Sequence, residues 1–195
     1  QLTGLAPLEN ARFTRNVEIA ANIPLQLGQD IDSESSGDES GSSVSLSSDG
    51  STIAIGATRN DGTGNNAGHV RVYKYDGAWK QLGGDINGQV AGDESGGGDN
   101  GSVGVSLSGD GTRVAIGSYK HFFSGHVRVF EIDANNTTTE PIGWTQMGSD
   151  IDGDGTNGRL GDGSSAVDLS KDGFRLVAGA RTYNGNNGVV RVYDW

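Results

Sequence analysis

Cysteine is absent from the chain. Without thiols the protein can form no disulfide and no thiolate metal site, and it has no cysteine nucleophile. Proline is scarce as well, with three residues in 195, and no apolar run approaches the ~20 residues that a membrane-spanning helix needs. An apolar stripe with the period of a helix is also missing, so the sequence favours neither a membrane span nor an all-helical fold.

Basic residues are few compared with acidic ones, at 14 against 25, which gives a formal net charge of −11. Such a surface repels nucleic acid and anionic lipid and therefore argues against nucleic acid as a partner. It suits divalent cations, although acidity also keeps a glycine-rich protein soluble. Hydrophobic residues make up only 33%, and 34 residues are glycine, a composition that favours many short strands joined by tight turns.

Three motifs recur three times in the same order, which is the signature of a repeat architecture. The motif GHVRVY starts at residues 68, 125 and 188, with small changes, and the motif VSLSSDGSTIAIGA starts at residues 44, 105 and 167. The motif LQLGQDI starts at residues 25, 80 and 145. These positions divide the chain into repeats of about 25–79, 80–144 and 145–195.

Each repeat reads as about four short antiparallel strands. From Val44 to Ser47, apolar residues alternate with serine, which is the pattern of a strand with one buried face. Asp49-Gly50 then marks a hairpin turn, because glycine tolerates the positive φ that such turns need. Residues 53–55, 70–72 and 80–86 supply the second, third and fourth strands.

Residues 1–24 match no repeat and form a separate N-terminal extension before a repeat domain at 25–195. Within the extension, Phe13, Val17 and Ile19 fall on one face of a strand. We predict an extra strand here that either completes a sheet of its own chain or adds to the open edge of a neighbouring copy.

The motifs resemble FG-GAP-type repeats, the units of integrin alpha-chain propellers. The resemblance rests on Trp-x-Gln-x-Gly at 79–83 and 144–148, the Ser-Val-x-Leu-Ser strand, the Ala-Ile-Gly-Ala strand and the closing Val-Arg-Val-Tyr, and it covers about residues 25–195. It implies β-propeller blades, an extracellular or cell-surface location, and adhesion or recognition rather than catalysis.

Two departures from that family matter. Its calcium loop, Asp-x-Asp-x-Asp-Gly-x-x-Asp, is replaced here by SSDG, SGDG and SKDG, and one carboxylate cannot supply the six to eight oxygens that calcium takes. Closed propellers have four to eight blades, so three repeats leave an open arc. Three alternatives follow: the chain belongs to a longer protein, two or more copies close or stack together, or the three sheets pack as a prism. The predicted fold class is therefore all-β, with three four-stranded blade-like repeats in an open or prism-like arrangement and an extra N-terminal strand.

A second candidate calcium site lies at Asp150, Asp152 and Asp154, whose alternation before a glycine is how a calcium loop begins. The alternative is a solvated acidic turn, because Asp150 recurs as Asp30 and Asp85, and a recurring aspartate often bonds turn amides. Calcium is thus a candidate ligand, and no cofactor is required.

Histidine and serine do not suggest a catalytic site. His69 and His126 occupy the same place in two repeats, with Val189 in the third, so they read as strand positions, and His121 stands alone. No Gly-x-Ser-x-Gly elbow and no phosphate loop is present. The sequence predicts that the protein is not an enzyme.

Two surface features remain. Phe122 and Phe123 lie in a loop whose counterparts lack paired aromatics, which indicates either a contact surface or a cap on the core. Sequons at Asn100, Asn135 and Asn136 are candidate glycosylation sites in a secreted protein.

Together these patterns predict a non-enzymatic extracellular structural protein, a building block that assembles with copies of itself into a surface or secreted fibre. The alternative is an adhesion or recognition module that binds a glycan or a cell-surface protein, with or without calcium.

Overall fold

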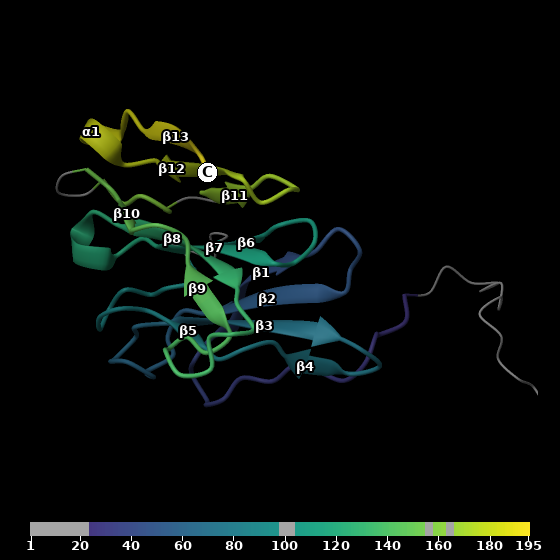
Figure 1. Ribbon diagram of the computed structural model, residues 1–195. Helices are drawn as coiled ribbons and strands as arrows, with labels where there is room; N and C mark the ends of the chain where they lie inside the picture. Colours follow the sequence, from purple (N-terminus) through teal and green to yellow (C-terminus); the bar gives the residue numbers. More distant parts are fainter. Residues whose placement is uncertain (1–23, 98–103, 155–157, 163–165) are drawn as a thin grey trace, which may run out of the picture.

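The computed structural model describes residues 24–97, 104–154, 158–162 and 166–195. Their regular structure is almost entirely β-strand, arranged as three antiparallel sheets that do not close on themselves (Figure 1). The all-β, propeller-like prediction is confirmed. Within these residues no helix has the length and apolar character that a membrane span requires.

Sheet one has five strands: β1 (Ser40–Leu46), β2 (Thr52–Ala57), β3 (His69–Tyr75), β4 (Trp79–Gln81) and β5 (Ile86–Asn87). The order across the sheet is β1-β2-β3-β4, and β5 pairs with the start of β3 while β4 pairs with its end.

Sheet two repeats this plan with β6 (Val105–Leu107), β7 (Arg113–Ser118), β8 (His126–Ile132), β9 (Trp144–Gln146) and β10 (Ile151–Asp152). A short 3-10 turn, η1 (His121–Phe123), precedes β8. Sheet three has β11 (Val167–Leu169), β12 (Arg175–Ala180) and β13 (Val189–Asp194), with the single helical turn α1 (Tyr183–Asn186) between the last two.

The sheets are offset from the sequence repeats. The opening strands of the second and third sequence repeats, β4–β5 and β9–β10, complete the sheet before them rather than the sheet that follows. The segment 80–86, predicted as a single fourth strand, forms the two short strands β4 and β5, so the sheets have five, five and three strands instead of about four each. The predicted N-terminal strand, with Phe13, Val17 and Ile19, lies outside the described residues.

One hairpin chemistry recurs in all three sheets. In sheet one, Ser47 Oγ donates to Asp49 Oδ1 at 2.7 Å and accepts the Thr52 N–H at 2.9 Å, while Gly50 has φ +72°. The same contacts are made in the other sheets by Ser108, Asp110 and Arg113 and by Ser170, Asp172 and Arg175. Each Ser-x-Asp-Gly segment thus satisfies its own polar groups, which explains why the turn forms wherever the segment occurs.

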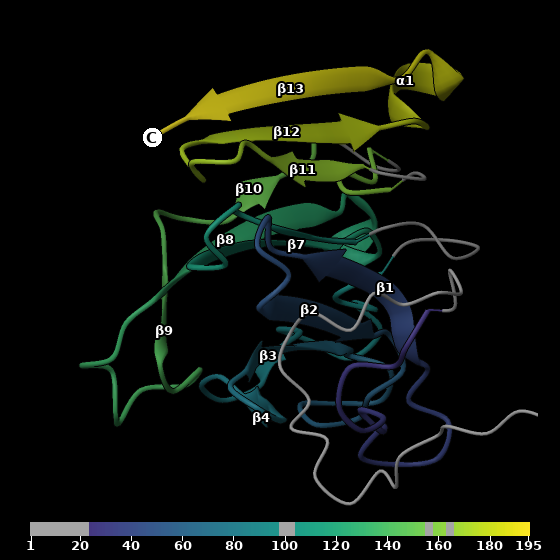
Figure 2. The same cartoon turned by 90° about the vertical axis from the view of Figure 1, so that its right-hand side faces the viewer.

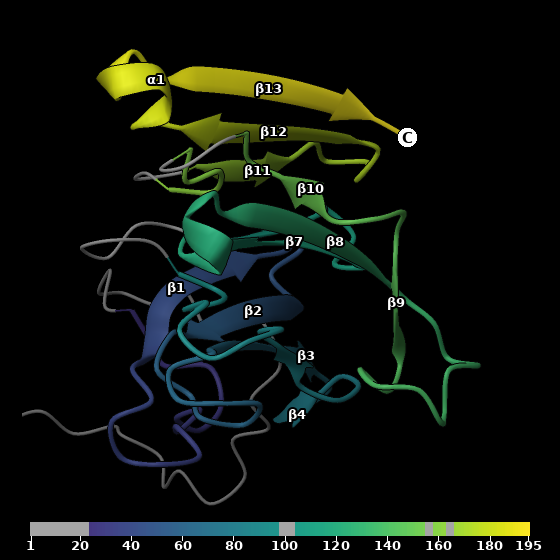
Figure 3. The same ribbon diagram turned by 90° about the vertical axis from the view of Figure 1, so that its left-hand side faces the viewer.

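Sheet two lies between the other two sheets (Figures 2 and 3). One core cluster joins sheets one and two, around Val70, Val72 and Phe130, and another joins sheets two and three, around Val127 and Leu176. The sheets therefore form an open series in which each packs on the next, and the prism-like alternative is not found.

Polar contacts connect successive sheets in the same way each time. Ser45 Oγ on β1 accepts the backbone N–H of Leu107 on β6 at 2.9 Å, and Ser106 Oγ on β6 accepts the N–H of Leu169 on β11 at 3.0 Å. The indole N–H of Trp144 donates to the Leu82 carbonyl at 3.0 Å. The spacing between sheets is therefore set by hydrogen bonds as well as by apolar packing.

Candidate functional site

The most extensive candidate site consists of the two sheet faces at the ends of the series. On the open face of sheet one, Val44 and Leu46 are 54% and 59% exposed. On the open face of sheet three, Val190 and Val192 are 69% and 62% exposed. Large apolar side chains grouped on a sheet face mark an interaction surface more often than a solvated one.

The two open faces are the two halves of a contact that the chain already makes twice. Val44 and Leu46 correspond to residues of β6 and β11 that are at most 6% exposed, because those strands pack on the preceding sheet: Val105, Leu107, Val167 and Leu169. Val190 and Val192 correspond to fully buried residues of β3 and β8, which face the following sheet: Val70, Val72, Val127 and Val129. The open face of sheet three is therefore apolar in the same way as the faces of sheets one and two that pack on the next sheet. A face like that of sheet one could pack on it.

The acidic turn after β9 places its three aspartates in different surroundings. Asp150 accepts hydrogen bonds from the side chains of Gln146 at 2.8 Å and Gln89 at 2.9 Å. Asp154 forms an ion pair with Arg191, and Asp152 is exposed on β10. Among the described residues, the groups of three close-set histidines and carboxylates do not include this trio, and calcium at Asp150, Asp152 and Asp154 stays a prediction.

The recurrence of Asp150 has a structural reason. The same bond from a glutamine four residues earlier is made by Gln26 to Asp30 and by Gln81 to Asp85, each at 2.7 Å. The Gln-x-x-x-Asp pair is therefore a feature of the repeated turn.

Phe122 and Phe123 are 71% and 75% exposed and both have positive φ, at 43° and 64°. A non-glycine residue in this region of backbone conformation costs on the order of 1–3 kcal/mol, and such residues gather at functional sites. Both rings border a cavity of about 560 Å³, whose other lining residues include Asp93 and Tyr119. The pair therefore lies on the surface and does not cap the core.

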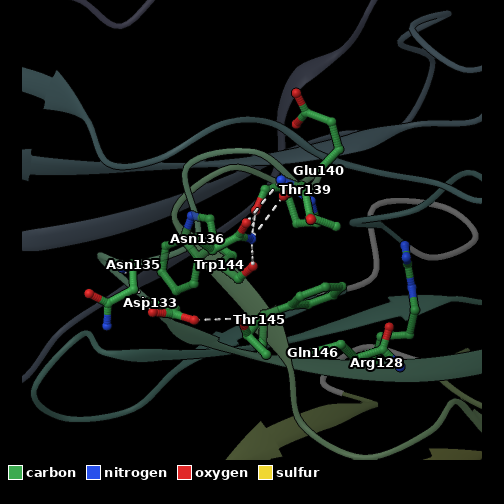
Figure 4. Close-up of a pocket in the computed structure, with 11 residues that line it drawn as sticks. Arg128, Asp133, Asn135, Asn136, Thr139, Glu140, Trp144, Thr145 and Gln146 are labelled. Atoms are coloured by element: carbon green, nitrogen blue, oxygen red, sulfur yellow. Dashed lines mark hydrogen bonds between the residues drawn. The ribbon is translucent and has the colours of Figure 1, made fainter.

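The predicted sugar acceptors differ in accessibility (Figure 4). Asn136 turns into its own loop, where its side-chain amide nitrogen donates to the carbonyls of Thr139, Pro141 and Trp144 at 2.7–3.1 Å. Asn135 is exposed and borders a second cavity, of about 550 Å³, which Asn136 and Trp144 also line. Of these two sequons, Asn135 has the free amide that N-glycosylation needs, whereas Asn100 lies outside the described residues.

Two buried histidines come together in sheet two, a feature that the sequence patterns alone did not reveal. The rings of His121 and His126 stack with centroids 3.9 Å apart, and His121 Nδ1 lies 2.9 Å from Asp93 Oδ1. All three side chains are buried, and neither ring nitrogen of His126 has a hydrogen-bond partner within the described structure. An unpaired buried polar group costs ~1–3 kcal/mol, so this arrangement needs an explanation.

Electrostatics keep the His126 ring neutral. Burial, with the charges of Arg128 and His121 acting in the same direction, lowers the pKa of His126 to about 3, and Asp150 opposes this shift. In sheet one, burial likewise lowers the pKa of His69, although the Asp85 carboxylate lies 3.7 Å from its Nδ1. Aligning the repeats shows that His121 takes the place of Asn60, but the contacts of His121 with Asp93 and His126 are seen only in the structure.

Comparison with known proteins identifies an FG-GAP repeat in the first part of the chain. The FG-GAP repeat family matches residues 32–73, which contain β1, β2 and most of β3. The predicted resemblance is confirmed for these residues. No curated protein matches the chain significantly.

Two solved structures similar to the chain are described as a putative 6-phosphogluconolactonase, one from Bacteroides uniformis and one from Bacteroides fragilis. The first is 20% identical with a TM-score of 0.47, and the alignment covers 77% of this chain and 35% of that one. The second is 17% identical with a TM-score of 0.48, over 77% and 33% of the two chains. This chain therefore spans about a third of the length of these structures.

These neighbours correct the prediction that the protein is not an enzyme, because they are described as enzymes. That prediction rested on the family resemblance, on the reading of His69 and His126 as strand positions, and on the lack of two sequence motifs. Catalytic groups can also come from loops of several blades without any such motif, since function belongs to a site and not to a fold. At these identities and TM-scores, the likeness assigns no reaction and no catalytic residue to this chain.

Proposed function

We propose that this protein is a self-assembling building block of an extracellular or cell-surface structure, with three FG-GAP-like repeats that present one blade-like sheet each. Copies of the chain pack head to tail, the open face of sheet three of one copy against the open face of sheet one of the next. The extracellular location is part of this proposal and follows only from what the resemblance to FG-GAP repeats implies.

The observation that carries this proposal is the complementarity of the two open faces. The same pair of faces packs twice within the chain, between sheets one and two and between sheets two and three. A third contact of the same kind, made between two copies, would cover Val190 and Val192 with Val44 and Leu46. Because the two faces differ, the contact is heterologous and gives either a ring or a filament.

Blade number indicates which assemblies to expect. Two copies would bring six sheets together, a number within the four to eight blades of closed propellers. A ring of two copies would have twice the chain mass of 20.1 kDa, whereas a filament would be larger and polydisperse.

The test is the solution mass of the 195-residue chain, measured by light scattering over a series of concentrations. We expect the unmodified chain to have at least twice the monomer mass. Leu46→Asp and Val192→Asp should each reduce this mass, because a charge buried in an apolar interface is strongly unfavourable. Both side chains are exposed within one copy, so the variants should stay folded, which circular dichroism checks.

The matched control is Phe123→Asp, which changes another exposed apolar side chain, on a loop of the middle sheet. It should leave the mass unchanged. A chain that is monomeric at every concentration, or an assembly that withstands both face variants, would refute the proposal.

Recognition of a partner through the Phe122–Phe123 loop is a second candidate function, favoured by the strained and exposed aromatic pair beside a cavity. Aromatic rings with one open face suit contact with sugars or proteins. Binding to a panel of immobilised neutral and acidic oligosaccharides tests it. The double variant Phe122→Asp/Phe123→Asp should lose whatever binding the unmodified chain shows, and no binding by the unmodified chain would argue against glycan recognition.

A further inference from the structure

Three positions recur in all three sheets, and the number of histidines at these positions differs from sheet to sheet. The first position is the aspartate after the acidic turn. The second is the third residue beyond the second strand of the sheet, and the third is the first residue of the third strand. They are occupied by Asp38, Asn60 and His69 in sheet one, by Asp93, His121 and His126 in sheet two, and by Asp162, Tyr183 and Val189 in sheet three. Only sheet two combines two imidazoles with the carboxylate.

The contact between the first two positions is the same in sheets one and two. Asn60 Nδ2 donates to Asp38 Oδ2 at 3.1 Å, and His121 Nδ1 lies 2.9 Å from Asp93 Oδ1. Sheets one and two therefore share a polar bridge here, which asparagine supplies as well as histidine. In sheet two the residue is His121, whose ring stacks on the ring of His126. The polar bridge alone does not explain this second imidazole.

The geometry of sheet two suits a metal ion. One ligand atom from each of Asp93, His121 and His126 lies within 4.8 Å of the other two. Ligand atoms around tetrahedral zinc lie ~3.3 Å apart, since zinc–nitrogen and zinc–oxygen bonds are ~2.0–2.1 Å long. The two rings are stacked, so binding requires them to rotate until one nitrogen of each points at the ion.

The surroundings hold the ligands in place. The other oxygen of Asp93 accepts the backbone N–H groups of Gln89 and Val90 at 2.9 and 3.0 Å, which fixes the carboxylate and keeps Oδ1 on the side of the His121 ring, 2.9 Å from its Nδ1. Both ring nitrogens of His126 are buried and have no hydrogen-bond partner among the described residues. Such outer contacts orient metal ligands, and a bound ion would supply the partner that His126 lacks.

We propose that Asp93, His121 and His126 form a binding site for Zn²⁺. Two imidazoles and a carboxylate are the ligand types that zinc prefers, and three protein ligands leave a fourth position for water. Asp93 also lines the cavity of about 560 Å³ beside Phe122 and Phe123, which gives an ion and its water a route to the site. Calcium does not suit this set, because it needs six to eight oxygens.

The local charges do not oppose a dication. The guanidinium of Arg128 is buried close by and bonds the Asn87 carbonyl at 2.7 Å. Against it stand the carboxylates of Asp93 and Asp150, and an Asp150 oxygen lies 4.0 Å from His126 Nδ1. Two negative charges and one positive charge leave a net negative site before the metal binds.

The related group in sheet one serves as an internal comparison. Glu34, His69 and Asp85 also lie within 4.8 Å of one another, but they offer a single imidazole, and Glu34 is exposed. We expect weaker zinc binding there, which makes His69 a suitable control position.

The experiment is a calorimetric titration of the chelator-treated 195-residue chain with Zn²⁺ alone, repeated with Co²⁺, whose visible absorption reports tetrahedral coordination. We expect one tight site per chain. His121→Asn introduces the residue that sheet one carries at this position and can keep the bond to Asp93, and His126→Val introduces the residue of sheet three. Each should weaken the tight site by at least about 100-fold, because loss of a ligand exceeds the effect of losing an outer contact.

His69→Val is the control and should leave the tight site unchanged. Circular dichroism checks whether each variant is folded, and His121→Asn tests the site even if His126→Val does not fold. The proposal is overturned if the chain binds no Zn²⁺ tightly, if binding withstands His121→Asn, or if only His69→Val removes it. The site lies in the middle sheet, so these results are independent of the assembly through the end faces.

Discussion

At the scale of single residues, the Ser-x-Asp-Gly hairpins have the clearest electrostatic consequence. The N–H of Ser51, together with the hydroxyls of Ser47 and Ser51, lowers the pKa of Asp49 from 3.8 to about 2. The pKa values of Asp110 and Asp172 are lowered by the same kind of hydrogen bond, although burial opposes the shift. Each hairpin therefore favours an ionised aspartate.

This predicts how stability depends on acid pH. A carboxyl whose pKa is lower in the folded state stabilises the fold above pH ~4 and loses that contribution as the pH falls from about 3.8 towards 2. The free energy of unfolding in urea should therefore fall between pH 5 and pH 2.5, and it should fall less in Asp49→Asn. Equal losses in the two proteins would show that this hairpin does not contribute.

At the scale of elements, the Ala-Ile-Gly-Ala strands meet the next segment at close range. A Cβ on Gly56 would overlap the backbone carbonyl of Gly96, whereas one on Gly117 would lie 3.2 Å from a Val167 methyl, and one on Gly179 would have 3.9 Å of clearance. The glycine of sheet one is thus required by packing, and that of sheet three is not.

We accordingly predict a graded response to alanine. Gly56→Ala should destabilise the protein by several kcal/mol, because backbone must move, and Gly117→Ala by about 1–3 kcal/mol through overpacking. Gly179→Ala should be close to neutral. Thermal and urea unfolding of the three variants would check this order, and equal effects at all three positions would contradict it.

The serines between successive sheets give a second prediction at this scale. Ser45→Ala and Ser106→Ala each remove the acceptor of a backbone N–H between inner strands, which should cost about 1–3 kcal/mol in unfolding free energy. Ser33→Ala, on an exposed segment, is the matched control and should change stability by less than about 0.5 kcal/mol. If all three variants unfold alike, the contacts between sheets do not depend on these hydroxyls.

At the scale of the whole molecule, head-to-tail assembly makes a prediction that a symmetric contact does not. Leu46→Asp damages only the face of sheet one, and Val192→Asp damages only the face of sheet three. Mixed in equal amounts, the two variants retain one intact pair of faces and should form a 1:1 complex that neither forms alone. Light scattering of the mixture measures this, and a mixture that stays monomeric would count against a heterologous interface.

Much of the fold could be predicted because its elements are decided locally. The repeat period, the hairpins and the alternation of valine and serine follow from residues close together in sequence, such as Ser47 bonding Asp49 and Thr52. The predicted number of about four strands per sheet differs from the structure because the single strand expected at 80–86 is two strands, β4 and β5, which pair with the end and the start of β3. Where such a segment breaks depends on the strand that it pairs with, which local patterns do not encode.

The candidate sites could be predicted only in part. The sequence singles out Phe122 and Phe123 because their loop differs from its counterparts. The histidine cluster joins Asp93 to residues that lie 28 or more positions away in sequence, and no local motif predicts it. By itself, the sequence determined the all-β repeat architecture, because turn chemistry and strand period act over a few residues. Only the tertiary structure decided which valine faces are covered, since Val72 and Val192 occupy the same place in their strands and differ solely in whether another sheet packs on them.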